Sequence, residues 1–453
     1  MKLTCYQSIA IGSILLATAA SAATRPRYGG TLHIQMQGPI TSLDPADASQ
    51  PDTLTRRNAL GLIFDTLLSL DNRGRLEPRL ALSWQPEPGN QAWQFTLRPG
   101  VRFSDGTPMT PEIVAESLTR SNPVWKISTQ ESGIIIQLES GSNLPSELAL
   151  ARNSIAKFAP GSIVGTGAFI PSEWDPGKRL VLTARDDYWG GRPFLDSVEF
   201  LMRKNLHDEA VAYELGQSQV IEVPPQQVHH ANESRQLQTS KPVELMALLF
   251  ARDAQSAEET KQRKALTLSI DRDQLNRVVL QDGGEPAGGL LPDWLTGYGF
   301  LFPHGANIAA AQQLRAEVPI AHAWTVGFDV NDPLAGLIAD RIVLNANDAG
   351  LRLQISNQRT PDIRLVRVPL ESLDPGVALI QITNALQLPA PKLLGETTDD
   401  LYHAENALLQ SERVLPLLHL RVAWAVSKTV KNWENTADGI WDVPDLWLAP
   451  GKP

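Results

Sequence analysis

Stretches with the pattern of strands alternate with stretches with the pattern of helices along most of this chain of 453 residues. No other sequence feature restricts the fold as strongly. Apolar and polar residues alternate over residues 30–37, as in a half-buried strand. Residues 332–347 carry apolar residues at the spacing of an amphipathic helix. The alternation predicts α/β or mixed α+β lobes and excludes a helical bundle or an all-strand sandwich.

The same reasoning places the other elements. We expect strands over residues 30–37, 93–97, 133–138, 179–184, 324–328 and 351–355. We expect helices over residues 54–70, 110–120, 258–280 and 332–347. Thr110 is a suitable cap for the second of these helices because Pro111 follows it in the first turn. No Pro/Ser-rich linker divides the chain, so short hinge segments are expected to join its lobes.

The composition excludes several classes of protein. Hydrophobic residues make up 42% and charged residues 20%, which is typical of a globular protein. Lys and Arg number 40 against 50 Asp and Glu, giving a net charge of −10. Proteins that bind nucleic acid or anionic lipid need a basic surface. We therefore expect neither nucleic-acid binding nor binding to anionic lipid.

The amino-terminal segment has the features of a secretory signal peptide over residues 1–22. Lys2 precedes a short apolar stretch at residues 8–20, and small residues lead to an expected cleavage after Ala22. Cys5, the only cysteine, lies inside this segment, so the exported chain would have no disulfide or thiolate metal site. No other segment has 18 uninterrupted apolar residues, so stable membrane insertion is not expected. The sequence predicts a periplasmic protein.

No set of residues suited to catalysis is recognisable. The G-x-S-x-G, H-E-x-x-H and Walker patterns are absent, and Gly165-Thr166-Gly167 lacks the third glycine of a dinucleotide loop. His229 and His230 are adjacent and would point to opposite faces of a strand, while His419 in an apolar run is interpreted as a core residue. The carboxylate pairs at 186–187 and 399–400 are interpreted as solvated. We expect no catalytic residue, no cofactor and no metal site.

Residues 80–117, LALSWQPEPGNQAWQFTLRPGVRFSDGTPMTPEIVAES, resemble the signature of a known family. It is family 5 of the extracellular solute-binding proteins, which includes dipeptide-, oligopeptide- and nickel-binding receptors of ABC importers. Further matching segments occur in the order found in the family: 29–32, 43–45, 64–67, 165–169, 187–191, 194–196, 263–272, 414–417 and 441–442. The aromatic residues of these segments, Trp84, Trp93, Tyr188 and Trp189, are interpreted as parts of the core.

The resemblance implies a periplasmic-binding-protein fold in which two lobes, joined by a hinge, close on a solute. It implies a discontinuous domain I at 23–249 plus 421–453, with domain II inserted at 250–420. It also implies a non-enzymatic, monomeric substrate-binding component that captures peptides and delivers them to ABC permease and ATPase subunits. In the peptide-binding members, the ligand backbone pairs with protein strands and an acidic residue holds its amino terminus.

The resemblance also indicates candidate ligand-binding residues. The family pattern consists of a tryptophan, two residues, an aspartate, two residues and Asp-Pro. Here Val368 replaces the tryptophan, Glu371 stands at the position of the amine-binding aspartate, and Asp374-Pro375 matches the end. Glutamate keeps the charge with one more methylene, so Glu371 is expected to hold a cationic end of the ligand, with Asp374 beside it. Arg367 is a weaker candidate for binding an anionic end of the ligand, with a solvated arginine as the alternative.

Departures from the family pattern leave alternatives open. Residues 250–253, Phe-Ala-Arg-Asp, replace the usual asparagine and proline after the first hinge strand, and the second lobe is expected to be shortened. The solute could therefore be a nickel chelate, a sugar or another compound. The chain could also be a sensor that keeps the fold without a role in transport. A secreted hydrolase is a third alternative, with no catalytic residues to support it.

Overall fold

The computed structural model describes most of the chain after residue 24. The described residues are 25–50, 52–71, 73–88, 91–138, 144–159, 162–202, 205–228, 237–319, 322–356, 360–393, 395, 397–434 and 439–450. Among them, no helix combines the length and the apolar character that a membrane span requires. The expected signal segment 1–22 and the His229–His230 pair lie outside the described residues.

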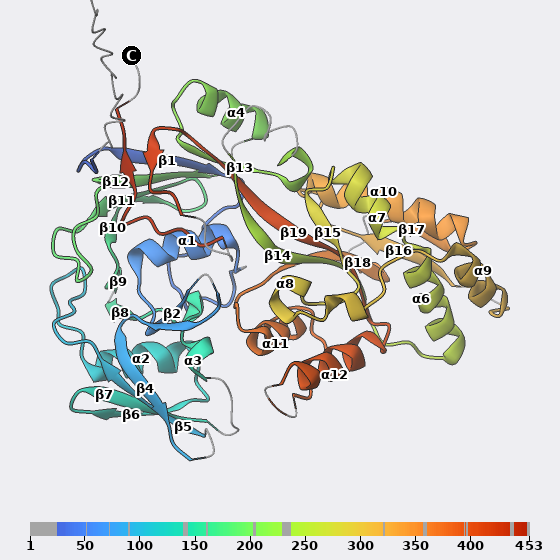
Figure 1. Cartoon of the computed structure of the whole chain (residues 1–453), viewed down its shortest axis with the longest axis horizontal. Helices are drawn as coiled ribbons and strands as arrows, with labels where there is room; N and C mark the ends of the chain where they lie inside the picture. The colour runs from blue at the N-terminus through green and yellow to red at the C-terminus, as the bar shows by residue number, and fades with distance from the viewer. Residues whose placement is uncertain are drawn as a thin grey trace, which may run out of the picture.

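One large mixed sheet runs through the whole molecule (Figure 1). In chain order its strands are β1 (Thr31–Met36), β10 (Phe169–Asp175), β11 (Arg179–Ala184), β12 (Ser197–Met202), β13 (Val220–Val223), β14 (Leu237–Phe250), β15 (Gly284–Pro286), β16 (Ala323–Gly327), β17 (Arg352–Ile355), β18 (Ile363–Pro369) and β19 (Val414–Val426). They are arranged as β10-β11-β12-β1-β13-β19-β14-β18-β16-β17, and β15 pairs with β19.

The long strands β14 and β19 connect two lobes. Residues 237–239 of β14 pair with 423–425 of β19, next to β13 in the first lobe. Residues 244–250 pair with β18 in the second lobe. The register shifts between Thr239 and Glu244, where bulges locally increase strand twist. The two ends of β14 thus pair with strands of different lobes, and the expected domain boundaries at 249/250 and 420/421 stay a prediction.

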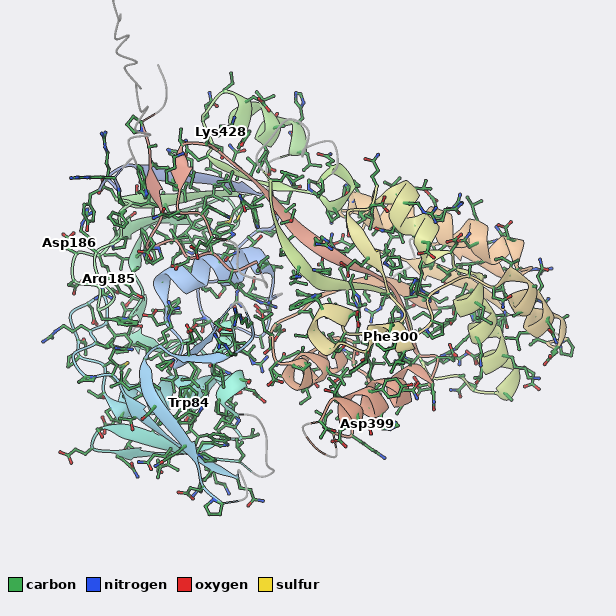
Figure 2. All side chains as sticks on the ribbon, in the orientation of Figure 1. Trp84, Arg185, Asp186, Phe300, Asp399 and Lys428 are labelled. Atoms are coloured by element: carbon green, nitrogen blue, oxygen red, sulfur yellow. The ribbon has the colours of Figure 1, made fainter. Side chains whose placement is uncertain are left out.

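The first lobe combines one half of the large sheet with smaller elements. These are α1 (Leu54–Ile63), β2 (Leu68–Leu70), β3 (Leu76–Pro78), β4 (Ala81–Pro86), β5 (Ala92–Leu97), α2 (Pro111–Ser121), β6 (Lys126–Gln130), β7 (Gly133–Gln137), α3 (Leu144–Glu147), η1 (Ala151–Asn153), β8 (Ala156–Ala159), β9 (Ser162–Gly165), α4 (Leu206–Glu214), η2 (Pro225–Gln227), β20 (Val430–Lys431) and β21 (Trp447–Leu448). Strands β4, β5, β7 and β6 form a separate sheet, and the partly buried side chains of Trp84 and Trp93 pack against its hydrophobic core. Figure 2 labels Trp84 at this sheet.

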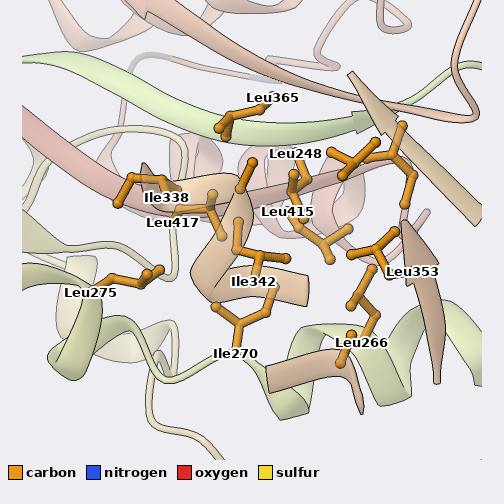
Figure 3. Packing of buried hydrophobic residues seen from close by; sticks show 14 of the residues in the cluster. Leu248, Leu266, Ile270, Leu275, Ile338, Ile342, Leu353, Leu365, Leu415 and Leu417 are labelled. Carbon is orange, nitrogen blue, oxygen red and sulfur yellow. The ribbon is translucent and has the colours of Figure 1, made fainter. Parts of the chain in front are cut away.

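The second lobe places helices on both faces of its sheet. They are α6 (Ala257–Ser269), α7 (Arg272–Gln274), η3 (Leu275–Val279), α8 (Asp293–Thr296), η4 (Gly299–Leu301), α9 (Ile308–Ala316), α10 (Pro333–Asp348), α11 (Pro375–Ala385) and α12 (Thr398–Leu409). Successive side chains of a strand point to opposite faces. Leu248 of β14 therefore packs with α6 and α10 (Figure 3), while Leu249 packs with α11 and α12. The lobe thus has two hydrophobic cores separated by its sheet.

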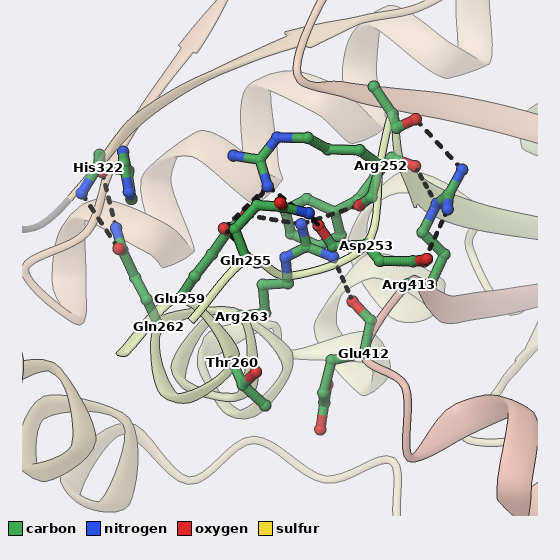
Figure 4. A network of polar contacts seen from close by, with 12 residues as sticks. Arg252, Asp253, Gln255, Glu259, Thr260, Gln262, Arg263, His322, Glu412 and Arg413 are labelled. Carbon is green, nitrogen blue, oxygen red and sulfur yellow. Dashed lines mark hydrogen bonds and ion pairs between the residues drawn. The ribbon is translucent and has the colours of Figure 1, made fainter. Parts of the chain in front are cut away.

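A buried polar network fixes helix α6 to the far end of strand β14 (Figure 4). Glu259 accepts a hydrogen bond from Arg263 at 2.7 Å and another from Arg252 at 2.9 Å. Arg263 is only 1% exposed, and its guanidinium lies 4.0 Å from the ring centroid of Phe250. Burial raises the pKa of Glu259, but the hydrogen bond from the Gln255 backbone N–H and the two guanidiniums together lower it to about 2. The unusual segment 250–253 therefore has a structural role in this lobe.

Most elements expected from the sequence are confirmed, and two helices are corrected. Residues 54–70 were expected to be one helix, but α1 ends at Ile63, and residues 68–70 form β2 by pairing with β3. Residues 258–280 were expected to be continuous, but Ile270 has an extended conformation and Asp271 caps a new helical turn. In both cases apolar spacing fits a helix, and tertiary pairing or a cap overrides it.

Candidate functional site

The three candidate residues lie on or just after strand β18. Arg367 is part of the strand, Glu371 follows it, and Asp374 is the N-cap of helix α11. The loop between Pro369 and Asp374 contacts the first lobe, so Glu371 and Asp374 lie at the interface between the lobes. Arg367 lies elsewhere, on the part of β18 that borders a cavity. The structure thus brings Glu371 and Asp374 together and separates them from Arg367.

Glu371 is paired with an arginine of the first lobe. Arg152 on η1 donates from Nη1 to Glu371 Oε2 at 2.9 Å and to Gln381 Oε1 at 2.6 Å. The side chain of Glu371 is 17% exposed. Burial raises the pKa of Glu371, while the positive charges of Arg57 and Arg152 lower it. Arg152 carries no recognisable signal in the sequence, because it lies 219 residues from Glu371 and no local pattern connects them.

Further contacts hold the lobes together around this ion pair. Asp374 accepts from the backbone N–H of Val377 and from the hydroxyl of Ser146, both at 3.0 Å. Arg57 of α1 donates to the carbonyl oxygen of Leu370. At Gly74 a Cβ atom would lie 3.2 Å from the carbonyl oxygen of Leu373, so the two backbones approach closely there. Asp374 therefore has a clear structural role as a helix cap.

Arg367 borders a cavity of about 500 Å³ in the second lobe. Its guanidinium forms ion pairs with Glu244 and, at 3.2 Å, with Asp332. The lining of the cavity also includes Phe328, Asp329, Val330 and Arg364. Arg367 is therefore compensated by two carboxylates of its own surroundings, and the cavity offers both apolar surface and charges of both signs.

Strand β18 has an open edge beside this cavity. The neighbouring strand β16 pairs only with Ile363 and Arg364, and no other described strand pairs with β18 on that side. The backbone N–H and C=O groups of the even-numbered residues of β18 point toward β14. This follows because the Leu370 N–H donates to Val243 O and the Ala251 N–H donates to Asp362 O. In an antiparallel pair the next residues point the opposite way. The backbone groups of Leu365 and Arg367 are therefore directed away from β14, along the cavity.

Glu222 of the first lobe and Glu244 of the crossing strand lie near Arg367, and Glu209 lies near Glu222. Glu222 of β13 accepts a hydrogen bond from Gln37 N–H at 3.2 Å, and Glu209 of α4 accepts one from the side chain of Gln37 at 2.8 Å. Burial raises the pKa of Glu209 to about 8. Burial also raises the pKa of Glu222, which the charge of Arg367 lowers and that of Glu244 raises further. The surroundings of Arg367 therefore carry more negative than positive groups, with Glu222 and Glu244 nearby.

The segments that carried the family resemblance meet at one buried carboxylate of the first lobe. Asp65 is 1% exposed and lies 2.6 Å from Arg79 Nη2. It also accepts hydrogen bonds from the indole of Trp189 and the hydroxyl of Thr166, both at 2.9 Å, and from Tyr188. These side chains connect four distant segments of the chain. Tyr188 and Trp189, like Trp84 and Trp93, are partly buried and pack against the hydrophobic cores of the first lobe, which agrees with their expected structural role.

The glycines and histidines that were considered as site residues have structural roles. A Cβ atom on Gly165 would lie 2.0 Å from Ile63 O, and one on Gly167 would lie 2.5 Å from Leu62 O. Both glycines are therefore required for close backbone packing. His419 is buried, its Nε2 lies 3.2 Å from Leu290 O, and burial lowers its pKa to about 4. Within the described part of the chain, no group of three or more His, Cys, Asp or Glu residues is arranged to hold a metal.

Comparison with known proteins shows a clear relationship. Residues 75–133 and 135–374 match the family described as bacterial extracellular solute-binding proteins, family 5. The chain is 23% identical over 307 residues to the oligopeptide-binding protein AppA of Bacillus subtilis, covering 60% of this chain and 55% of AppA. The chain spans about half the length of the curated relatives it matches.

Solved structures share the fold over nearly the whole chain. AppA from Bacillus subtilis with a nonapeptide superposes with a TM-score of 0.78 at 16% identity, covering 94% of this chain and all of AppA. NikA from Staphylococcus aureus with Ni(L-His)2 gives 0.76 at 19% identity, covering 92% of this chain and all of NikA. Identities this low establish the fold alone. The architecture is therefore that of the two-lobed periplasmic binding proteins, as the sequence predicted.

Proposed function

The chain belongs to family 5 of the bacterial extracellular solute-binding proteins, and on that premise we propose that it is the substrate-binding component of an ABC importer. It captures a short peptide between its lobes and delivers it to permease and ATPase subunits in the membrane. It acts as a monomer without enzymatic activity, in the periplasm, after cleavage of the signal peptide behind Ala22. A related protein, AppA, has been solved with a nonapeptide.

The observation that supports a peptide as the solute is the open edge of β18 beside the 500 Å³ cavity. An extended peptide can add a strand to an exposed sheet edge, and its main-chain hydrogen bonds then supply affinity without requiring one sequence. Leu365 and Arg367 each offer a backbone N–H and a C=O on this edge. The apolar and charged lining around them suits varied side chains. A sugar or a nickel chelate would not use a strand edge.

The charged residues have proposed roles at the ends of the bound solute. Glu371 holds a cationic end, such as a peptide ammonium, because a buried ammonium requires a carboxylate partner. Asp374 fixes the loop that carries Glu371 by capping helix α11. Arg367 binds an anionic group in the cavity when the solute has one, sharing its charge with Glu244 and Asp332.

The test begins with protein purified gently from the periplasm and mass spectrometry of the small molecules it releases. We expect a mixture of short peptides, followed by calorimetric titration with a released peptide and with the same peptide N-methylated on alternate backbone nitrogens. One hydrogen bond contributes about 0.5–1.5 kcal/mol. Loss of two should therefore weaken binding by roughly fivefold or more.

Three other outcomes would count against this proposal. Equal affinity for the methylated and unmethylated peptides would exclude pairing at the strand edge. Release of a sugar or of a nickel chelate would replace the peptide as the solute. Co-purification with a signalling receptor instead of permease subunits would favour sensing over transport.

A further inference from the structure

The ion pair between Arg152 and Glu371 joins the two lobes directly. Arg152 belongs to η1 in the first lobe, and both of its close acceptors, Glu371 and Gln381, belong to the second lobe. The side chain of Arg152 is 32% exposed, and that of Glu371 is 17% exposed. Since the partners lie in different lobes, this pair forms only when the lobes are together.

Arg152 has a second carboxylate within its own lobe. Its Nη2 lies 3.6 Å from Glu147 Oε2, at the end of helix α3. If Arg152 leaves Glu371, its charge can still be compensated by Glu147. The exchange therefore does not leave an isolated guanidinium, and a guanidinium keeps its charge at every accessible pH.

Glu371 does not have the same alternative. The two arginines that lower its pKa, Arg57 and Arg152, both come from the first lobe. Asp52, also from the first lobe, has the opposite effect on that pKa. When the lobes separate, Glu371 loses both arginines. When Arg152 alone turns away, Glu371 keeps only Arg57, which already pairs with Asp52 at 3.1 Å. A carboxylate that stays partly buried without a partner is unfavourable.

Resting on the proposed function, we propose that Arg152 is an internal counter-ion of Glu371, which a cationic group of the solute displaces. The incoming ammonium takes the place of the guanidinium, and Arg152 then pairs with Glu147. A neutral solute brings no charge to replace Arg152, so Glu371 would be left with Arg57 alone, whose charge Asp52 already shares. Arg152 is thus a specificity-determining residue, since the cation of a solute must replace it.

The ion pair between Arg152 and Glu371 also acts on the ligand-free protein. The bridge favours the closed arrangement of the lobes even without solute, so only a fraction of the molecules is open to receive one. The apparent dissociation constant rises in inverse proportion to the fraction of protein that is competent to bind. Removal of the bridge should therefore open the ligand-free protein and also tighten the binding of cationic solutes.

The test uses Arg152→Gln in the full chain, with Arg192→Gln as the matched control. Arg192 is 33% exposed and pairs with Asp186 and Asp196, so its ion pairs stay within the first lobe. Small-angle scattering of the ligand-free proteins should give a larger radius of gyration for Arg152→Gln only. Titration with trialanine should show about fivefold tighter binding to Arg152→Gln, the effect of an ion pair near the upper end for partly exposed pairs. Binding of N-acetyl-trialanine should tighten less than that of trialanine, because it gains only from the larger open fraction and not from the released carboxylate.

A second variant approaches the same pair from the other lobe. Glu371→Gln should also expand the ligand-free protein, and it should abolish any preference for trialanine over N-acetyl-trialanine. An unchanged radius of gyration in both Arg152→Gln and Glu371→Gln would overturn the inference. Unchanged affinity of Arg152→Gln for a trialanine that binds the wild type would also overturn it.

The inference and the proposed function can fail separately. If trialanine and its acetylated form bind to no variant, capture of such peptides is wrong, and the radius of gyration alone decides the role of the bridge. If peptides bind normally but Arg152→Gln neither expands the protein nor changes affinity, the proposed function stands and Arg152 is not a competitor.

Discussion

Replacement of Asp65 by asparagine is expected to destabilise the first lobe strongly without touching the solute. Asp65 Oδ1 interacts with the guanidinium of Arg79, at 2.8 Å from Nε and 2.6 Å from Nη2. Asp65 Oδ2 accepts hydrogen bonds from the Thr166 hydroxyl and the Trp189 indole N–H. The side chain of Asp65 is fully buried. Asparagine has the same shape but places an NH2 group against one of these two sets of donors. It also removes the charge that compensates Arg79.

The size of the effect follows from the exposure of the partners. Loss of one partner of a buried ion pair costs about 3–5 kcal/mol. The side chain of Arg79 is 33% exposed, so water partly compensates its charge. We therefore expect Asp65→Asn to lower the free energy of unfolding by about 2–4 kcal/mol. The matched control is Asp186→Asn, whose side chain is 87% exposed and pairs with Arg192 at the outer edge of the first lobe (Figure 2). For the control we expect a change of at most about 0.5 kcal/mol.

Urea unfolding followed by tryptophan fluorescence measures both variants, because Trp189, Trp84 and Trp93 pack in the same core of the first lobe. Titration with a bound solute below the unfolding transition should show wild-type affinity for Asp65→Asn. If Asp65→Asn were no less stable than Asp186→Asn, the interpretation of Asp65 as the centre of the first-lobe scaffold would be refuted. If it lost affinity while keeping stability, Asp65 would belong to the solute site instead.

Two further variants test the packing and the electrostatics of the structure. Gly165→Ala places a methyl group 2.0 Å from Ile63 O, so we expect a loss of about 2–3 kcal/mol in urea unfolding. Gly305→Ala, which meets no atom within 4 Å, serves as its control, and equal stability of the two would contradict the packing argument. Glu405 accepts from Tyr298 at 2.8 Å, and burial raises its pKa to about 7. The folded state therefore holds this proton more tightly than the unfolded chain, so this group makes the protein less stable as pH rises from about 4.5 to about 7. Glu405→Gln should consequently lose less stability than the wild type between pH 5 and pH 8, which the melting temperatures of both proteins at these two pH values will show. Parallel pH profiles would exclude ionisation of Glu405 as the cause, since His419 is present in both proteins.

Local sequence signals identified elements that depend on short-range chemistry. Thr110 and Pro111 predicted the start of α2, and the structure shows the Thr110 side chain accepting from Ile113 N–H. The spacing over residues 332–347 predicted α10 almost to its ends, with Asp332 as its cap. The same kind of signal failed for residues 54–70. There the apolar spacing continues, but pairing between β2 and β3 decides the conformation of residues 68–70.

The candidate site was only partly predictable for the same reason. The family pattern gave Glu371 and Asp374, and the structure places both where the lobes meet. It did not reveal that Arg152 compensates Glu371 or that Ser146 binds Asp374. Nor did it show that Arg367 already pairs with Glu244 and Asp332. A pattern records which residues occur in order along the chain, whereas counter-ions are selected by distance in space.

By itself, the sequence determined the class of fold, the family, the order of most strands and helices and the acidic position after β18. These properties follow from periodicity, caps and motifs, which act over a few residues or one helical turn. Only the tertiary structure decided that β14 and β19 link both lobes in one sheet, that β18 keeps an open edge, and that an arginine of one lobe neutralises a glutamate of the other. Such features depend on packing between segments hundreds of residues apart, and the energy of an ion pair depends on the burial and distance that this packing creates.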